Sequence, residues 1–183
     1  MILPDMHRIE GVRIVLRLVV PEDAAYIHAL RKDARFNTHL SVVGGDVTYQ
    51  REWINQYKMR EAIGSEYYYV IERRMDQRPC GVVRLYNITA DSFTWGSWIL
   101  DHNKPSKAAL ESAVLSFSAG LERLGAGKAL LDVRVLNTHA TAFYQRFGAT
   151  EIGRDGDNIY FELTRANFLA RLTAFRQIIE ALE

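Results

Sequence analysis

The sequence predicts an α/β (α+β) protein in which helices flank a central mixed, mostly antiparallel β-sheet. Strand-like runs rich in β-branched residues and amphipathic helix-like segments follow one another in the order β-α-α-β-β-β-α-β-α-β-β-α. Three of the strands come in succession with only short turns between them, which indicates an antiparallel meander. A strand, a helix and a hairpin then follow, and this βαβ unit makes the sheet mixed.

The first part of the chain predicts one strand and two helices. Residues 12–20 are rich in β-branched residues and are expected to form a strand. Residues 21–32 begin with proline and two acids, which are favoured in the first turn of a helix. A glycine pair indicates a loop over residues 41–46. A second helix is expected over residues 48–63, with three large residues near one face: Trp53, Ile54 and Tyr57.

The middle of the chain predicts the meander. Its strands are expected over residues 66–73, 80–88 and 93–100, with turns over residues 75–79 and 89–92. These three strands account for much of the antiparallel part of the sheet.

Helices and strands alternate in the next part of the chain. A long amphipathic helix is expected to end at the glycines of residues 125–127. A strand over residues 130–136, a helix over residues 137–148 and a hairpin of residues 149–153 and 159–163 come next. The long helix carries apolar residues at helical spacing: Leu110, Val114, Phe117, Leu121 and Leu124.

One domain is expected to include the whole chain, residues 1–183, because this length is typical of a single domain. A terminal helix over residues 164–182 either packs on its own sheet or forms an appendage that dimerises. Its apolar seam consists of Phe168, Leu172, Phe175, Ile179 and Leu182.

The composition excludes several classes of protein. The chain has 23 Lys and Arg against 22 Asp and Glu, so no global field attracts nucleic acid or an anionic membrane. Its one cysteine, Cys80, excludes an intramolecular disulfide and a cysteine-rich metal site, and the five histidines have no metal-ligand spacing. The start of the chain lacks the apolar run of a signal peptide, and no segment has transmembrane length. We therefore expect a cytoplasmic protein without a metal.

The most informative segment directly follows the strand at residues 130–136. Asn137 suits the N-cap of a short helix, and Gly148 suits its end. Four apolar residues recur at i, i+3, i+4 and i+7 and form one face of this helix: Ala140, Phe143, Tyr144 and Phe147.

This segment and the order of elements resemble the acetyl-CoA-binding half of the GNAT N-acetyltransferases. The RimJ/RimL-like branch of that family is similar at residues 16–23, at Trp53-Ile54 and at residues 81–85. The resemblance covers about residues 12–168 and implies the GNAT fold. It also implies an enzyme that moves an acetyl group from acetyl-CoA to a primary amine by direct attack.

The resemblance implies that the acetyl-CoA site lies along the third strand of the meander. Trp98, Ile99 and Leu100 would offer backbone groups to the pantetheine arm. A backbone N–H at this point would also stabilise the oxyanion that forms during transfer.

The family binds pyrophosphate with a loop of pattern Q/R-x-x-G-x-G/A, and this chain departs from it. Lys104 stands in the Q/R place, Lys107 stands where the first glycine belongs, and Pro105 removes a backbone donor. Either the two lysines compensate with charge, or the loop no longer binds the cofactor. The corresponding loop residues are Lys104, Ser106, Lys107, Ala108 and Ala109.

By the same resemblance, the catalytic residues lie in the segment that begins at Asn137. Asn137 would contact the pantetheine arm or the acceptor, a role compatible with capping the helix. Phe143 would line the cofactor site. Tyr144 would protonate the departing CoA thiolate, and its alternative role is that of a core aromatic.

The sequence does not identify the general base that takes the proton of the acceptor amine. Related enzymes often have a glutamate where this chain has Thr94, which cannot act as a base. The remaining candidates are Glu72, Asp91, His102, His139 and ordered water.

The acceptor also has alternatives. Residues 84–88 and 95–99 are similar to the GNAT subgroup that acetylates amino groups on nucleotide-linked sugars. Protein N-termini, such as those of ribosomal proteins, are the competing acceptors. The altered loop also permits a non-catalytic acyl-CoA-binding or interaction module. The expected partners are acetyl-CoA and a small amine, with no nucleic acid and no membrane.

Overall fold

An eight-stranded sheet forms the centre of the part of the chain that the computed structural model describes, residues 5–36, 38–39 and 44–181. Its strand order is β1-β2-β3-β4-β5-β6-β8-β7. Neighbouring strands are antiparallel except for the parallel pair β5 and β6. The strands are β1 (Arg8–Glu10), β2 (Ile14–Leu18), β3 (Tyr67–Arg73), β4 (Pro79–Tyr86), β5 (Ser92–Leu100), β6 (Lys128–Arg134), β7 (Thr150–Arg154) and β8 (Asn158–Thr164).

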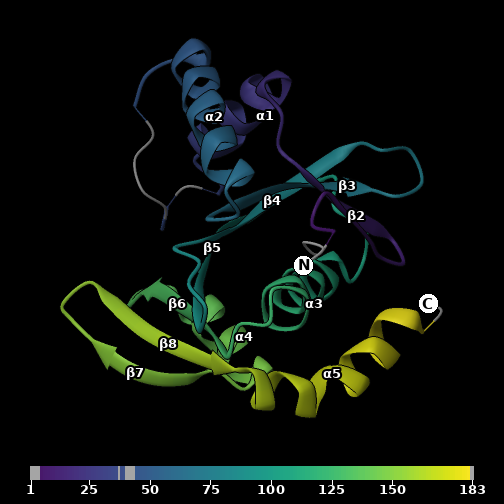
Figure 1. Cartoon of the computed structure of the whole chain (residues 1–183), viewed down its shortest axis with the longest axis vertical. Helices are drawn as coiled ribbons and strands as arrows, with labels where there is room; N and C mark the ends of the chain where they lie inside the picture. The colour runs from purple at the N-terminus through teal and green to yellow at the C-terminus, as the bar shows by residue number, and fades with distance from the viewer. Residues whose placement is uncertain (1–4, 37, 40–43, 182–183) are drawn as a thin grey trace.

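Helices cover the two faces of the sheet unequally. Two of them, α1 and α2, pack on one face of the half that contains β3 and β4, and the others pack on the opposite face (Figure 1). The β6–β8–β7 half extends beyond α1 and α2 (Figure 1). The helical segments are η1 (Pro21–Asp23, a 3-10 turn), α1 (Ala24–Lys32), α2 (Val47–Ala62), α3 (Ala108–Ser118), η2 (Ala119–Arg123, a π turn), α4 (Thr138–Phe147) and α5 (Arg165–Glu180). None of the described helices combines the length and the apolar character that a membrane span requires.

This arrangement confirms the predicted fold class and the predicted order of elements, with one addition. Strand β1 was not predicted, because its three residues place only Ile9 in the core and are too few to show an alternating pattern. Of the loop predicted over residues 41–46, residues 41–43 lie outside the described part of the chain.

The long helix predicted to continue to the glycines at residues 125–127 changes character earlier. After α3 the chain forms the π turn η2. Within this turn Gly120 packs against Phe93, and a Cβ at this position would lie 2.2 Å from the ring. A glycine is therefore required for the helix to approach β5 this closely.

The terminal helix packs on its own sheet. Phe168, Leu172 and Ile179 of α5 are buried in the same core cluster as the residues of α3. Phe175 is partly buried against that cluster, and Leu182 lies outside the described residues. These contacts favour the packing interpretation of this helix over the dimer interpretation.

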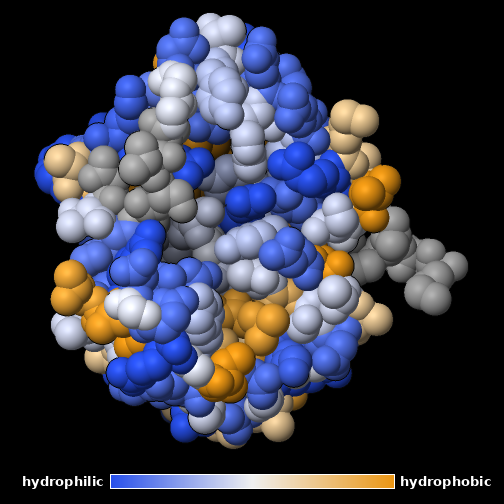
Figure 2. Space-filling model, turned by 90° about the vertical axis from the view of Figure 1, so that its left-hand side faces the viewer, coloured by the Kyte–Doolittle hydropathy of each residue, from blue (hydrophilic) through white to orange (hydrophobic). Residues whose placement is uncertain are grey.

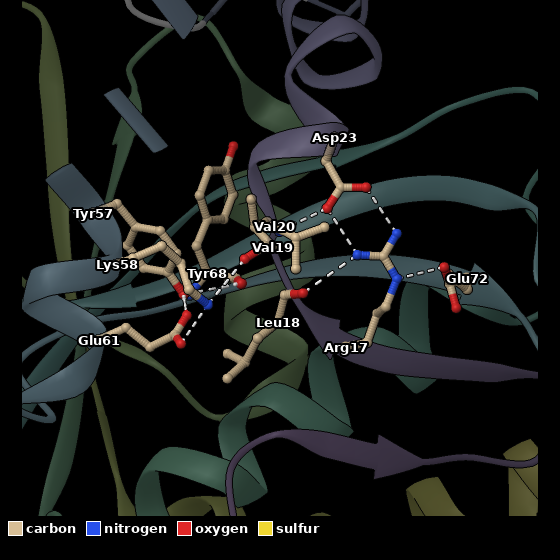
Figure 3. Close-up of polar contacts among 10 residues, drawn as sticks. All are labelled: Arg17, Leu18, Val19, Val20, Asp23, Tyr57, Lys58, Glu61, Tyr68 and Glu72. Atoms are coloured by element: carbon tan, nitrogen blue, oxygen red, sulfur yellow. Dashed lines mark hydrogen bonds and ion pairs between the residues drawn. The ribbon is translucent and has the colours of Figure 1, made fainter. Parts of the chain in front are cut away.

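A buried ion-pair network ties the start of α1 to the sheet (Figure 3). The guanidinium of Arg17 on β2 donates two hydrogen bonds of 2.8 Å to the carboxylate of Asp23 and one of 2.6 Å to Glu72 on β3. The hydrogen bond to Asp23 is the main reason that the pKa of Arg17 lies above its ordinary value. Asp23 also accepts a hydrogen bond of 2.8 Å from the N–H of Val20. The network therefore fixes the path by which the chain leaves the sheet for α1.

A second set of polar contacts fixes α2 (Figure 3). The hydroxyl of Tyr57 accepts a hydrogen bond of 2.9 Å from the backbone N–H of Tyr68 on β3 and donates to Glu61. Lys58 donates to the same carboxylate at 2.5 Å and to the carbonyl of Val19 at 3.3 Å. Because these contacts join α2 to β3 and to the backbone of Val19, α2 has a defined position over the sheet.

Candidate active site

Strands β5 and β6 separate from one another after a short parallel pairing. They pair only over three positions, Ser92 to Thr94 with Lys128 to Leu130. Beyond these positions β5 continues along β4, and β6 continues along β8. The facing edges of the two strands therefore leave backbone N–H and C=O groups without a partner strand.

A cavity of about 480 Å³ fills this opening. Figure 2 looks onto this side of the molecule, where the surface is hollowed between the part with α1 and α2 and the part with β6 and β8. Strand β5 contributes Gly96, Ser97, Trp98 and Ile99, and β6 contributes Asp132, Val133 and Arg134. The remaining walls include Arg31, Phe36, His39, Tyr68, Tyr86, Asn137, His139, Phe143 and Tyr144.

A β-bulge shapes the β5 side of the cavity. The register between β4 and β5 shifts between Val82 and Arg84, and Ser97 has a left-handed backbone with φ of 48°. The extra residue turns Trp98 to the same face as Trp95, although strict alternation would place them on opposite faces. The two indole rings lie 5.2 Å apart.

Serines of α3 hold the two tryptophans in place. The indole N–H of Trp95 donates to Ser116 at 2.8 Å, and that of Trp98 donates to Ser112 at 3.1 Å. Trp98 also stacks on Phe143 of α4, with ring centroids 5.0 Å apart. The bulge is therefore held from behind by α3 and α4, and its backbone edge stays open to the cavity.

The helix α4 has the boundaries that its sequence predicts. The side-chain oxygen of Asn137 accepts a hydrogen bond of 3.1 Å from the N–H of Ala140, and Gly148 ends the helix with φ of 91°. The capping role of Asn137 is thus confirmed. Its side chain also lines the cavity, and its contact with the cofactor or acceptor stays a prediction.

Tyr144 has a ring in the core and a place in the cavity wall. Its ring makes edge-to-face contacts with Trp95 and Phe161, at centroid distances of 5.9 Å and 6.0 Å. Burial raises the pKa of its hydroxyl above the ordinary value, with smaller contributions from the charge of Asp132 and from Tyr86. The phenol is therefore protonated at neutral pH, as a proton donor must be.

Comparison with known proteins identifies the family of this chain. Residues 13–150, most of the chain, match the family model described as an acetyltransferase (GNAT) domain. The chain belongs to the GNAT acetyltransferase family. This confirms the resemblance, the enzyme class and the use of acetyl-CoA as acetyl donor, and the RimJ/RimL-like branch stays a prediction.

Solved structures show the same fold. The apo structure of FdhC, a nucleotide-linked sugar GNAT, is 37% identical with a TM-score of 0.87, over 94% of this chain and 98% of FdhC. RimJ from Mycobacterium smegmatis in complex with CoA-disulfide is 20% identical with a TM-score of 0.79, over 97% of this chain and 96% of RimJ. A spermidine N-acetyltransferase from Vibrio cholerae, in complex with CoA and spermine, is 19% identical with a TM-score of 0.73, over 87% and 99% of the two chains. No curated protein matches the sequence significantly.

The predicted pyrophosphate loop of this acetyltransferase leads into α3. Lys107 is the N-cap of α3 and has a left-handed backbone with φ of 60°, the conformation in which glycine is most at ease. The N–H groups of Lys107, Ala109 and Leu110 form no hydrogen bond with the described part of the chain, although Ala108 donates to Pro105 at 3.3 Å. Free N–H groups at the start of a helix suit a phosphate. The loop thus keeps the backbone features of the family pattern without its first glycine.

Most side chains of this predicted loop do not line the cavity. Ala109 lines it, whereas Lys104, Ser106, Lys107 and Ala108 do not. The Lys107 ammonium donates to the carbonyl of Ala181 at the end of α5, at 2.6 Å. Its charge is therefore directed at a helix C-terminus, and its proposed help with phosphate stays a prediction. On β5, Trp98 and Ile99 line the cavity, and Leu100 packs on the core.

We expect Lys107→Gly to stabilise the folded enzyme. A non-glycine residue in the left-handed region costs about 1 kcal/mol, which glycine avoids. Urea denaturation should therefore show a higher free energy of unfolding in this variant, by less than the full strain of about 1 kcal/mol, because glycine also frees the unfolded chain and removes the Lys107–Ala181 hydrogen bond. Lys104 has no positive φ, so Lys104→Gly is the matched control and should lower it slightly. A lower unfolding free energy for Lys107→Gly would contradict the strain.

The structure excludes one predicted base and finds a carboxylate that the sequence reading missed. Glu72 is paired with Arg17 outside the cavity, so its selection as a candidate base was wrong. Asp91 and His102 do not line the cavity, and His139 does. Asp132 also lines it.

The missed residue, Asp132, had a signal in the sequence. It is the one acidic side chain in the strand predicted over residues 130–136, between Leu131 and Val133, which are both buried on the face that carries α3, α4 and α5. Side chains of a strand alternate, so Asp132 faces the other side of the sheet. Within the described residues, no group of three or more acidic, histidine or cysteine side chains is placed to hold a metal ion.

Proposed function

We propose that this GNAT enzyme transfers the acetyl group of acetyl-CoA to the primary amine of an amino sugar that is linked to a nucleotide diphosphate. The charge of the cavity carries the proposal. Two arginines, Arg31 and Arg134, line it, and Asp132 is the one carboxylate among its described lining residues. Arginine is suited to bidentate contacts with phosphate. A polyamine acceptor would instead require several carboxylates.

Aromatic groups on the α1 and β4 side of the cavity support the same acceptor. Phe36 and Tyr86 line this part of the wall, are partly exposed, and offer ring surfaces to a base or a sugar, whereas the ring of Tyr68 is buried behind them. The 37% identity to FdhC, a nucleotide-linked sugar GNAT, points to the same acceptor class. Protein N-termini remain the second candidate, because RimJ has a similar fold.

The donor side follows from the separated strands. We propose that the open edge of β5 at Trp98 and Ile99 pairs with the amide groups of the pantetheine arm, and that the N–H groups at the start of α3 face the pyrophosphate. Acetyl-CoA supplies the activated acetyl group as a thioester. Tyr144 would then give its proton to the departing sulfur. Asn137 would contact acetyl-CoA near the N-terminus of α4.

A cytoplasmic location, a single domain and the absence of nucleic-acid or membrane partners are part of the proposal. The near balance of 23 basic and 22 acidic residues supports the absence of polyanionic partners. The single cysteine is buried, which suits a reducing compartment.

The test is a steady-state panel of acceptors with acetyl-CoA. It contains a nucleotide-linked amino sugar, the same sugar without its nucleotide, a peptide with a ribosomal-protein N-terminus, and spermidine. We expect the nucleotide-linked sugar to have a kcat/KM at least a hundredfold above the others. Arg31→Ala and Arg134→Ala should each raise its KM about tenfold, as expected for a lost phosphate contact of about 1.4 kcal/mol.

Other outcomes would replace the proposal. A higher kcat/KM for the peptide would favour a protein N-terminal acetyltransferase. If none of the four acceptors is acetylated but acetyl-CoA still binds in a calorimetric titration, the result would favour an acyl-CoA-binding module.

A further inference from the structure

Asp132 is an exposed carboxylate in the wall of the cavity, without a counterion among the described residues. It lies in the middle of β6, opposite Tyr160 of β8, and within the described part of the chain its side chain forms no hydrogen bond or ion pair. The basic side chains that line the cavity belong to two arginines and two histidines: Arg31, Arg134, His39 and His139. A positively charged ligand group in this cavity would therefore be drawn to Asp132.

Gly96 keeps the space near Asp132 open. Thr94 and Leu130 are the last paired positions of β5 and β6, so Gly96 and Asp132 are the next positions on the same face, where the strands have begun to separate. The hydroxyl of Tyr86 lies 3.3 Å from the point that a Cβ of Gly96 would occupy. A larger residue at this position would therefore crowd Tyr86 and reduce the space near Asp132.

Tyr144 reaches the same cavity from the opposite face of the sheet. Its helix, α4, packs on the face that holds Trp95 and Leu131, whereas Asp132 faces the α1 and α2 side. A proton acceptor and a proton donor thus lie on the two sides of the slot between β5 and β6. Transfer of the acetyl group from sulfur to nitrogen needs both groups. The amine must lose a proton on the acceptor side, and the thiolate must gain one on the donor side.

We propose that Asp132 binds the amino group of the acceptor and removes the proton that blocks its attack. An amine with an ordinary pKa arrives largely as an ammonium ion, and the carboxylate takes one proton to free the nitrogen lone pair. A C–N bond to the acetyl carbon then forms, the C–S bond breaks, and its electron pair goes to sulfur. Tyr144 protonates that sulfur, and the second proton of the nitrogen passes to water. Exchange with water then restores both side chains, and one proton is released overall.

This inference rests on the acetyltransferase activity and not on the acceptor proposed above. Any primary amine brings the same charged group into the slot. Asp132 acts here as a catalytic residue, because its carboxylate touches the reacting nitrogen.

The test compares Asp132→Asn with the unchanged enzyme at several pH values. The assay uses whichever acceptor has the highest kcat/KM in the panel above, or ethanolamine at high concentration if none of them is acetylated. At pH 7 we expect kcat/KM for the acceptor to fall about thirty- to a hundredfold, within the range of general base catalysis. The acetyl-CoA Kd should stay within about twofold, as expected for a residue that contacts only the acceptor.

The pH dependence separates a base from a structural residue. As the pH rises through the pKa of the acceptor amine, more of the acceptor arrives neutral and needs no base. The gap between the two enzymes should therefore narrow steadily from pH 6 to pH 9.5. Asp132→Glu keeps a carboxylate and should recover part of the lost activity. The matched control is Glu162→Gln on the neighbouring strand, whose carboxylate pairs with Lys128 outside the cavity, and it should leave kcat/KM unchanged.

Three results would overturn the proposal. These are a kcat/KM of Asp132→Asn within about threefold of the unchanged enzyme, a deficit of equal size at every pH, and a loss of acetyl-CoA affinity as large as the loss of turnover. If Asp132→Asn does not fold, failure of the soluble Asp132→Glu variant to show any pH-dependent activity would overturn it equally.

Discussion

Replacing Tyr144 by phenylalanine is expected to lower kcat about a hundred- to a thousandfold. The phenol of Tyr144 lies in the cavity wall, and its raised pKa keeps it protonated at neutral pH. Without it, the departing thiolate must take its proton from water, and loss of a general acid typically costs this factor. Steady-state kinetics with the best acceptor gives the measurement, and calorimetry should show an acetyl-CoA Kd within about twofold of the original.

The ring of Tyr144 makes this substitution a clean one. Phenylalanine keeps the edge-to-face contacts with Trp95 and Phe161, so the fold should be retained. Tyr160→Phe is the matched control, because that hydroxyl bonds to Asp155 at the surface and lies outside the cavity. Turnover of Tyr144→Phe equal to that of the control would leave Tyr144 with a packing role only.

The raised pKa of Tyr144 also predicts a pH profile. An acid catalyst fails when it loses its proton, and an ordinary tyrosine does so near pH 10. Burial, helped by the charge of Asp132, moves the pKa of Tyr144 upward from that value. The unchanged enzyme should therefore show no loss of kcat from this group below about pH 10.

The local signals that predicted α4 were strong because they were self-contained. A cap at Asn137, four apolar residues on one face and a glycine at Gly148 are all properties of a single segment, and the structure reproduces them. The order of elements was predictable for the same reason. Each strand and helix carries its own periodicity, and only the three-residue β1 was too short to show one.

The features of the site that were missed depend on pairing between distant segments. The bulge at Ser97 is visible only in the register of β5 against β4, and Ser97 carries none of the preference of glycine for its left-handed backbone. Lys107 likewise has a left-handed backbone, which favours glycine, although it is not a glycine. The residue types at these two positions do not reveal the left-handed backbone, because neither residue is a glycine.

The general base could not be identified from the sequence for a related reason. Glu72 and Asp132 both lie on strands, and the sequence does not show which neighbour each carboxylate meets. The register of β2 on β3 places Arg17 within 2.6 Å of Glu72 and neutralises it, whereas the separation of β5 from β6 leaves Asp132 facing the cavity. The two carboxylates therefore lie in different surroundings: Glu72 is paired with Arg17, and Asp132 faces the cavity without a partner among the described residues.

Replacing Arg17 by alanine is expected to lower the free energy of unfolding by about 3 kcal/mol. Its guanidinium is the shared counterion of Asp23 and Glu72, whose side chains are only 10% and 9% exposed. Removing one member of a buried ion network leaves uncompensated charge, which costs about 3–5 kcal/mol. Arg17 itself is 25% exposed, so water can compensate in part and the lower end of that range applies. Urea denaturation measures the change.

Arg8 provides a control that differs mainly in burial. It lies directly opposite Arg17 in the β1–β2 ladder and also pairs with a carboxylate, Glu10, but the two side chains are 47% and 50% exposed. Exposed ion pairs contribute about 0–1 kcal/mol, so Arg8→Ala should change the unfolding free energy by less than about 1 kcal/mol. Equal effects of the two substitutions would show that the Arg17 network does not hold the fold.

The Arg17 substitution should also reach the active site through α1. Asp23 holds the start of this helix on the sheet, and Arg31 near its other end lines the cavity. If this anchor is lost, Arg31 is held less firmly toward the acceptor phosphate proposed above, while β5 and α4 keep their contacts with α3. We therefore expect Arg17→Ala, assayed below its unfolding temperature, to raise the acceptor KM severalfold and to leave the acetyl-CoA Kd nearly unchanged. A rise in both constants would mean that the network supports the whole sheet and not the acceptor side alone.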